Sequence, residues 1–306
     1  MKYIYFVVFI LIILTLILPG CIEKEAKVNL SIIQEPDVRE NDTVLKVAFA
    51  SGVSPQESYV YYEELTGYIS RKLGGPVKIV QRRTSREINN LIYDNLIDFS
   101  FVNSGAYVEG NEDFGMKLLA APKINGRTTY NSYIIVPKNS TYSNITDLRG
   151  KKFAFSDPLS NSGKLYLAYR LSLINETPGS FFGFDEKGRS NYFYTYSHDS
   201  SIIAVSGELA DGAAVNSLIY EYMNNTKPDI IANTRIIEVS PPFGIPPVVV
   251  SKDIDPFLEE RLKDIFLKMD KDEEGKMILS KIMIDKFVNI NDNAYDSIRE
   301  MRKKVQ

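Results

Sequence analysis

The chain has 306 residues, of which 44% are apolar and 25% are charged, and its formal net charge is −3. Its 36 basic residues are interspersed among 39 acidic ones, so it lacks the basic excess typical of nucleic-acid-binding proteins. The single cysteine leaves no internal disulfide, so a buried core must stabilise the fold.

Residues 1–20 have the layout of an export signal. Lys2 gives a short positive start, Tyr3–Leu18 carry no charge, and a Pro-Gly pair precedes Cys21. The string LPGC resembles a bacterial lipobox, in which the cysteine becomes the lipid-bearing first residue of the mature protein. The 16 residues of Tyr3–Leu18 would span about 24 Å as a helix, less than the roughly 30 Å of a bilayer core. We therefore expect cleavage of a signal peptide and lipidation at Cys21; an uncleaved membrane anchor and a free thiol are the alternatives.

The segment 21–44 is charged, lacks hydrophobic periodicity and contains a proline. We interpret it as a tether between the lipid and the folded part. Without residues 1–20 the chain has 35 basic and 39 acidic residues, a net charge of −4. We expect the mature protein on the outer face of the cell membrane.

From Leu45 onward strand and helix patterns alternate. Apolar strand patterns occupy 45–50, 76–80 and 97–102, and helix patterns lie between them at 59–69 and 85–93. Strands that alternate with helices predict a parallel sheet with right-handed crossovers. We assign 45–132 to the first part of one lobe.

The alternation repeats in residues 133–237, which we assign to a second lobe. The C-terminal part, 238–306, is expected to return through a hinge and complete the first lobe, with Asp255 capping a helix that starts at Pro256. Expected strands of these two parts lie at 133–137, 151–157, 191–196, 212–216, 236–240 and 248–251, and expected helices at 145–150, 160–174 and 200–209.

Two α/β lobes of similar size predict a hinged receptor that binds a ligand in the crevice between them. Open α/β sheets bind ligands at the carboxyl ends of their strands. Polar and small residues at these strand ends are therefore the candidate site residues.

The strongest candidate is the turn Asp157–Gly163, which links a strand to a helix. The free amides of a first helical turn attract anions, and the hydroxyls of Ser160 and Ser162 add donors beside Asn161 and Gly163. Helix capping would need only one such residue, so we expect an anion site; simple capping is the alternative.

A second candidate is the segment that contains His198, the only histidine, and Asp199. It also follows a strand and begins a helix. No second histidine or cysteine lies nearby, so a metal site is not expected. The pair suits a pocket for a hydroxyl or amine of the ligand, and a structural or capping role is the alternative.

Two further strand junctions carry candidates. Tyr130 precedes a strand, and its phenol either reaches the crevice or packs in the core. Ser54 follows the first strand, where Gly52 allows backbone amides to approach a ligand; an ordinary turn is the alternative.

These segments together match a known family. The strings TYNSYIIV, DLRGKKFAFSDPLSNSG, YSHDSSIIAVSGELADGAAVNS and VSPPFGIPP resemble the phosphonate/phosphite/phosphate-binding proteins of ABC importers, in order and spacing, and the likeness runs from about Leu45 to the end. The resemblance implies a two-lobed type II periplasmic-binding-protein fold that closes on a tetrahedral oxyanion. On the family pattern Ser160, Asn161 and Ser162 hold the oxyanion together with Tyr130. The pattern also implies that Asp199 and His198 face the substituent on phosphorus.

Two departures from the family pattern concern the ligand. Asn161 stands where the family usually has threonine. The asparagine keeps a hydrogen-bond donor at this position but changes its geometry. The family often has a tyrosine at the start of the second helix, where this chain reads Arg83-Thr84-Ser85-Arg86. Arg82, Arg83 or Arg86 could compensate, although arginines at a helix start are usually solvated.

The resulting hypothesis is a lipid-anchored solute-binding protein that passes a phosphorus oxyanion to a permease and, indirectly, to its ATPase. We expect a monomer without cofactor, metal or catalytic residues. A carboxylate at Asp199 favours a substituted phosphonate or a protonated oxyanion over dianionic phosphate. The alternatives are a sensor or scaffold lipoprotein of the same fold and a receptor for another small organic anion. A hydrolase is disfavoured, since no nucleophile–base pair or metal cluster is evident.

Overall fold

In the computed structural model, residues 44–50 and 54–305 are described. The expected signal peptide, Cys21 and the tether up to residue 43 lie outside them. Within the described part, no helix is both long and apolar enough to cross a membrane.

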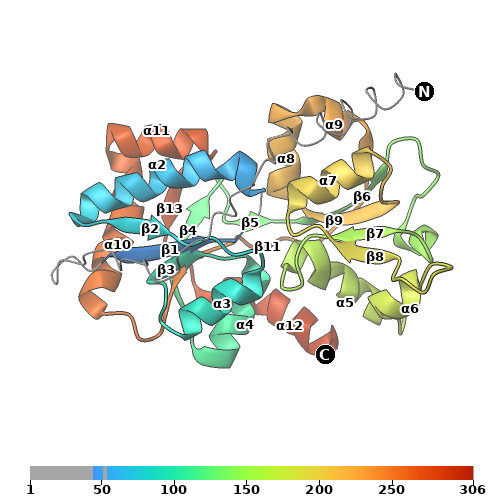
Figure 1. Cartoon of the computed structure of the whole chain (residues 1–306), viewed down its shortest axis with the longest axis horizontal. Helices are drawn as coiled ribbons and strands as arrows, with labels where there is room; N and C mark the ends of the chain where they lie inside the picture. The colour runs from blue at the N-terminus through green and yellow to red at the C-terminus, as the bar shows by residue number, and fades with distance from the viewer. Residues whose placement is uncertain (1–43, 51–53, 306) are drawn as a thin grey trace, which may run out of the picture. The chain divides into compact units, whose positions relative to one another are not determined.

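The first lobe is built on a six-stranded mixed sheet (Figure 1). Its strands β1, β2 and β3 pair in parallel, as the strand–helix alternation predicts, whereas β12 and β4 pair antiparallel. The order is β13-β4-β12-β3-β1-β2, with bounds β1 Leu45–Phe49, β2 Val77–Ile79, β3 Phe99–Phe101, β4 Lys117–Lys123, β12 Val248–Val250 and β13 Lys286–Val288.

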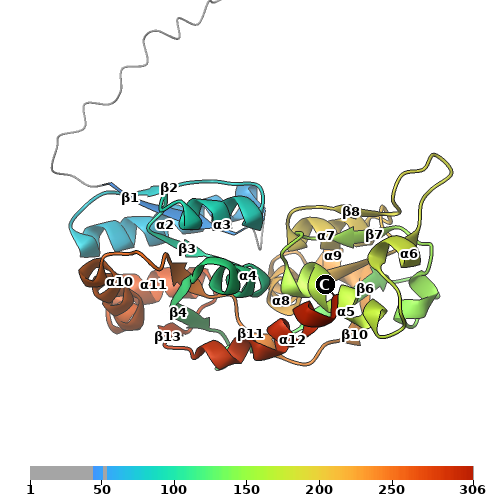
Figure 2. The ribbon, with the colours of Figure 1, turned by 90° about the horizontal axis from the view of Figure 1, so that it is seen from below.

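Helices cover both faces of this sheet. One face packs against α2, α10 and α11, and the other against α3 and α4, as Figures 1 and 2 show for α2, α11, α3 and α4. The bounds are α2 Pro55–Leu73, α3 Ser85–Tyr93, α4 Ser104–Phe114, α10 Pro256–Lys268, the 3₁₀ turn η3 Met269–Lys271, and α11 Glu273–Lys281.

The second lobe is built on a five-stranded sheet of order β10-β6-β9-β7-β8. Its strands are β6 Ser132–Pro137, β7 Phe153–Phe155, β8 Tyr192–Tyr194, β9 Gly212–Asn216 and β10 Thr234–Val239. Its helices are η1 Ile145–Leu148, η2 Asn161–Leu165, α5 Tyr166–Ser172, α6 Pro178–Phe182, α7 His198–Ser206, α8 Ser217–Thr226 and α9 Pro228–Ala232.

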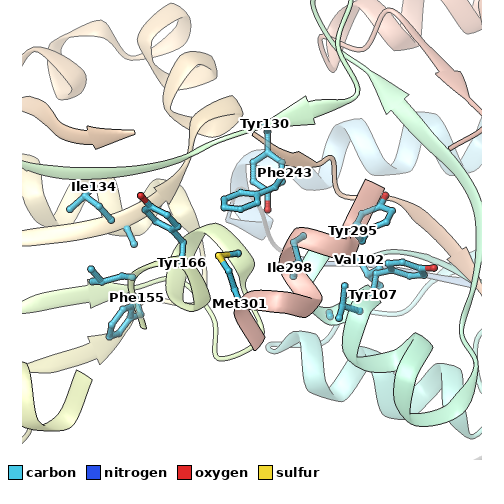
Figure 3. Close-up of a cluster of buried hydrophobic side chains, with 14 of the residues drawn as sticks. Val102, Tyr107, Tyr130, Ile134, Phe155, Tyr166, Phe243, Tyr295, Ile298 and Met301 are labelled. Carbon is cyan, nitrogen blue, oxygen red and sulfur yellow. The ribbon is translucent and has the colours of Figure 1, made fainter. Parts of the chain in front are cut away.

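Two chain segments cross between the lobes as a short antiparallel pair. In it β5 (Thr129–Tyr130) lies beside β11 (Phe243–Gly244), with Phe243 opposite Tyr130. After the turn η4 (Asp292–Tyr295), the C-terminal helix α12 (Asp296–Val305) packs against α4 of the first lobe and α5 of the second. Figure 3 shows Ile298 and Met301 of α12 between Tyr166 on one side and Tyr107 and Tyr295 on the other. The C-terminal segment therefore contacts both lobes, beyond its expected return to the first.

Local sequence signals explain where several elements begin and end. Thr84 and Glu87 form a reciprocal capping box at the start of α3, and Gly74 ends α2 with a φ of 74°. The side chain of Asp255 accepts a hydrogen bond from the amide of Leu258, as expected for the cap of α10.

Two predicted helices have different bounds in the structure. The helix expected at 160–174 begins as a π-helical turn, η2, and ends at Ser172. The helix expected at 200–209 begins at His198 and ends at Ser206, because Ser197 is still extended and Glu208 adopts a positive φ of 56°. The earlier start puts His198 and Asp199 in the first turn of α7.

Candidate functional site

The turn after β7 is buried and held by its own hydrogen bonds. The Ser160 side chain caps η2 by accepting a hydrogen bond from the Gly163 amide at 2.9 Å. The amide of Ser156 donates back to the carbonyl of Gly163 at 3.3 Å. Ser160, Asn161 and Ser162 are each at most 2% exposed. Three buried polar side chains in one turn cost free energy unless each has a partner, protein or ligand.

His198 reaches this turn from the first turn of α7. Its Nδ1 accepts a hydrogen bond from the Asn216 amide at 3.1 Å, so in the neutral ring the proton is on Nε2. Nε2 lies 3.5 Å from the hydroxyls of both Ser156 and Ser160. These are long contacts, so the Nε2–H group remains available for a shorter bond to a ligand.

The ring of His198 is uncharged at neutral pH. Burial lowers the pKa of His198 to about 4, against the opposing effect of the Asp199 carboxylate. The imidazole therefore acts as an oriented neutral donor.

Gly163 is required by the close packing of these groups. A Cβ at this position would lie 1.8 Å from Ser156 Oγ and 2.9 Å from His198 Cε1. Both neighbours are buried. The glycine therefore allows the turn to approach the histidine.

Tyr130 and Asn161 form a separate buried pair. Nδ2 of Asn161 donates to the Tyr130 hydroxyl at 3.1 Å, and Oδ1 of Asn161 is buried without a hydrogen-bond partner. Burial raises the pKa of Tyr130, while hydrogen bonds with Asn161, Ser104 and Ser162 favour the opposite direction. The turn also touches the start of α4, since a Cβ on Gly105 would lie 2.3 Å from the carbonyl of Leu159.

Two carboxylates of the second lobe accept hydrogen bonds from helix starts of the first lobe. Asp199 Oδ1 accepts the amide of Ser54, the N-cap of α2, at 3.0 Å. Asp157 Oδ2 accepts the amide of Ser85, the first residue of α3, at 3.0 Å, and its Oδ1 accepts the amide of Leu159 at 2.8 Å. Both carboxylates face helix N-termini, where negative charge is favourable.

A cavity of about 260 Å³ opens between the lobes beside this cluster. Ser156, Asp157, Ser160, His198 and Asn216 line its polar end, together with Asn103 of the first lobe. Of the residues singled out in the sequence, Ser160 and His198 therefore face the cavity. The others are adjacent but do not line it: Ser54, Tyr130, Asn161, Ser162, Gly163 and Asp199.

None of the three arginines considered as compensating groups lines the cavity. Arg82 donates to the carbonyl of Gln81, and the guanidinium of Arg83 lies 4.2 Å above the ring of Tyr196. Arg86 pairs with Glu109 at 3.0 Å. Each makes a contact elsewhere, so the hydrogen-bond donors that line the polar end of the cavity are neutral side chains.

Ser156 and Asn216 also line the cavity, although neither was expected from the sequence as a site residue. Both stand at the carboxyl ends of buried strands, Ser156 directly after β7 and Asn216 as the last residue of β9. The expectation that ligands bind at the carboxyl ends of strands could therefore have identified both residues. Within residues 44–50 and 54–305, no three His, Cys, Asp or Glu side chains are grouped to hold a metal ion.

Comparison with known proteins identifies the family. Residues 47–295 match the family model described as the phosphonate periplasmic substrate-binding protein of an ABC transporter. The phosphonates-binding periplasmic protein of Escherichia coli (strain K12) is 26% identical over 162 residues. That match covers 52% of this chain and 46% of the E. coli protein.

Solved structures share the fold. The binding component of an ABC phosphonate transporter from Pseudomonas aeruginosa has a TM-score of 0.78 and 23% identity, with 86% of each chain covered. PhnD1 from Prochlorococcus marinus, in complex with methylphosphonate, has a TM-score of 0.75 and 20% identity, with coverage of 86% of this chain and 98% of that one. They confirm the two-lobed type II fold, and the matched family is one of transport receptors and not of enzymes. This chain thus belongs to the family of phosphonate periplasmic substrate-binding proteins of ABC transporters.

Proposed function

We propose that this protein is the substrate-binding component of an ABC importer and captures a phosphorus oxyanion between its lobes. The observation that carries the proposal is the cluster of Ser156, Ser160 and His198 at the polar end of the interlobe cavity. All three are neutral donors at the carboxyl ends of strands. Family membership supports phosphorus over other oxyanions.

In this proposal His198 donates its Nε2–H, and the two serines donate their hydroxyls, to the oxyanion oxygens. Hydrogen bonds from neutral donors to a charged acceptor are worth about 1.5–3 kcal/mol each. A micromolar dissociation constant corresponds to about 8 kcal/mol, which a small number of such bonds in a closed crevice can supply. No arginine is needed.

Asn161, Ser162, Gly163 and Tyr130 would complete the oxyanion site from the side of the turn. The support is the buried, unpartnered Oδ1 of Asn161. A half-turn of this amide lets Tyr130 donate to Oδ1 and frees Nδ2 as a donor to the ligand. Asp199 and Ser54 would act across the lobes, through the hydrogen bond between them.

Titration of the full chain in lipid nanodiscs tests this function. We expect binding of at least one of phosphate, phosphite, methylphosphonate and 2-aminoethylphosphonate. At a ligand concentration a hundredfold above the dissociation constant, it would raise the free energy of unfolding by about 2.7 kcal/mol. If none of these four compounds binds, and no other substituted phosphonate binds, phosphorus oxyanions are excluded as the ligand class.

Ser160→Ala should weaken that binding about tenfold or more, because one charge-assisted bond is lost. Ser172→Ala is the matched control, since Ser172 bonds only the carbonyl of Tyr169 in α5 and does not line the cavity. Equal losses in the two variants would contradict a ligand role for Ser160.

We further propose that Cys21 carries the lipid and that 21–44 tether a monomeric receptor near its permease. The sequence supports this organisation, since an apolar run precedes Cys21 and a charged segment follows it. After that segment comes the folded part, which we assign as 45–132, 133–237 and 238–306. Cys21→Ser should release a soluble protein that still binds ligand but supports uptake poorly. Membrane fractionation and mass spectrometry provide the measurement, and persistent membrane association through residues 3–18 would favour the uncleaved anchor.

A further inference from the structure

The interlobe cavity has a polar end and a larger, mostly apolar wall. Tyr61 and Leu65 of α2 and Phe101 of β3 contribute from the first lobe, and Ile219 and Tyr222 of α8 from the second. Phe101 belongs to a stack of rings, since Phe49 lies 4.8 Å from it and 4.0 Å from Tyr62. The wall is therefore a packed surface.

Most of these side chains are only half-buried in the structure, although Leu65 is buried. Tyr61, Phe101, Ile219 and Tyr222 all retain partial exposure although they surround one cavity. Apolar surface that faces water is unfavourable, in proportion to its area. A ligand group that covers this wall would gain affinity in proportion to the area it buries.

The two charged side chains among the described residues that line the cavity already have partners in the protein. Of the described lining residues, Asp157 accepts two backbone amides and Lys281 pairs with Glu64 at 2.8 Å. Asp199, which the family pattern suggests for an amine or hydroxyl, bonds the Ser54 amide and does not line the cavity. Apart from the phenol hydroxyls of Tyr61, Tyr62 and Tyr222, the wall away from the polar end is therefore lined mainly by apolar groups.

The size of the cavity also exceeds the needs of a small oxyanion. A dry cavity of about 150 Å³ accommodates benzene. The volume here is about 260 Å³, so it has room for a ring of that size beside a tetrahedral headgroup.

We propose that the ligand is a phosphorus oxyanion with an apolar substituent about the size of a phenyl ring. The oxyanion lies at Ser156, Ser160 and His198, and the substituent packs against Tyr61, Phe101 and Ile219. This inference rests on the proposed function and specifies its ligand class; the phosphonate and the phosphate monoester share the required chemistry.

Calorimetric titration of the full chain in nanodiscs with a ligand series tests the inference. From methylphosphonate to propylphosphonate we expect about a fourfold fall in dissociation constant per methylene. Phenylphosphonate or phenyl phosphate should bind at least about twentyfold tighter than methylphosphonate. Comparison of the dissociation constants of phenylphosphonate and phenyl phosphate shows whether the site prefers a phosphonate or a phosphate monoester.

Ile219→Asn should lower the affinity for phenylphosphonate to nearly that for methylphosphonate. The affinity for methylphosphonate itself should change less than about twofold relative to the unmodified protein. Ile230→Asn is the matched control, because Ile230 is a half-buried residue of the same hydrophobic cluster on α9 but does not line the cavity. The ligand series on the unmodified chain tests the inference even if either variant fails to fold.

Equal binding of methyl- and phenylphosphonate, or tightest binding of 2-aminoethylphosphonate, would overturn the inference and leave the proposed function intact. Failure of every phosphorus oxyanion to bind would overturn both.

Discussion

His198 shows at the residue scale how the fold turns an ordinary side chain into a fixed donor. The Asn216 amide occupies Nδ1, so the neutral ring must present Nε2–H toward Ser156 and Ser160. Burial keeps the ring neutral by lowering its pKa. A residue that was ambiguous between a structural and a ligand role can thus combine both.

This burial predicts acid sensitivity that originates at one residue. The pKa of the ring is about 4 in the folded state and about 6.5 when unfolded, so the unfolded chain binds the proton more readily between these values. The contribution of His198 to stability is full above pH 6.5 and should fall by about 3 kcal/mol as the pH drops to 4. Chemical unfolding at a series of pH values should show a flatter profile for His198→Gln.

Because His198 is the only histidine, the Hε1 proton of its ring gives a single NMR signal that can be followed through a pH titration. A titration midpoint near 6.5 in the folded protein would contradict the neutral, buried ring. A midpoint well below 6 would agree with it.

At the scale of elements, helix starts in one lobe meet carboxylates from the other. Asp199 faces the N-terminus of α2, and Asp157 that of α3. Each contact joins the lobes directly and replaces water on a backbone amide. A carboxylate at a helix N-terminus stabilises it by about 0.3–1 kcal/mol, and by up to about 2 kcal/mol when partly buried. We infer that these two contacts hold the lobes together in the arrangement of this structure.

Asp157→Asn should therefore weaken closure. We expect ligand affinity to fall about twofold to tenfold, because a neutral amide interacts less with the α3 dipole. Small-angle scattering of the ligand-bound protein should detect the more open form. Asp185→Asn is the control, since Asp185 accepts the amides of Lys187 and Arg189 within a single turn of the second lobe. A similar affinity loss in both variants would show that the contact of Asp157 with α3 does not hold the lobes together.

For the folded part as a whole, α12 connects the lobes on the side of their crossing strands. Arg302 bonds Glu112 of α4 at 2.7 Å, which attaches the helix to the first lobe. Ile298 and Met301 are buried in a cluster that also contains Tyr166 of α5 and Tyr107 of α4 (Figure 3). The C-terminal helix thus stabilises both lobes together.

Met301→Ala should lower the free energy of unfolding by about 2–4 kcal/mol, because it removes a buried side chain and leaves a cavity. Val305→Ala, at a position in the same helix that is 38% exposed, should change it by less than about 0.5 kcal/mol. Denaturant unfolding followed by tyrosine fluorescence measures both. If Met301→Ala leaves the free energy of unfolding unchanged, α12 does not contribute to the stability of the core.

The sequence alone determined the fold class, because strand and helix periodicities follow from local hydrophobic spacing. It also pointed to Ser160 and His198, because the carboxyl ends of buried strands meet at one edge of an α/β sheet. It could not show that Asn216 orients the imidazole or that Asp157 and Asp199 bond helix starts across the lobes. Nor could it show that Tyr130 and Asn161 pair with each other beside the cavity without lining it. Those contacts join residues far apart in the chain, and only the packing of the two lobes brings them together. The apolar wall beside the donors arises in the same way, from α2, β3 and α8.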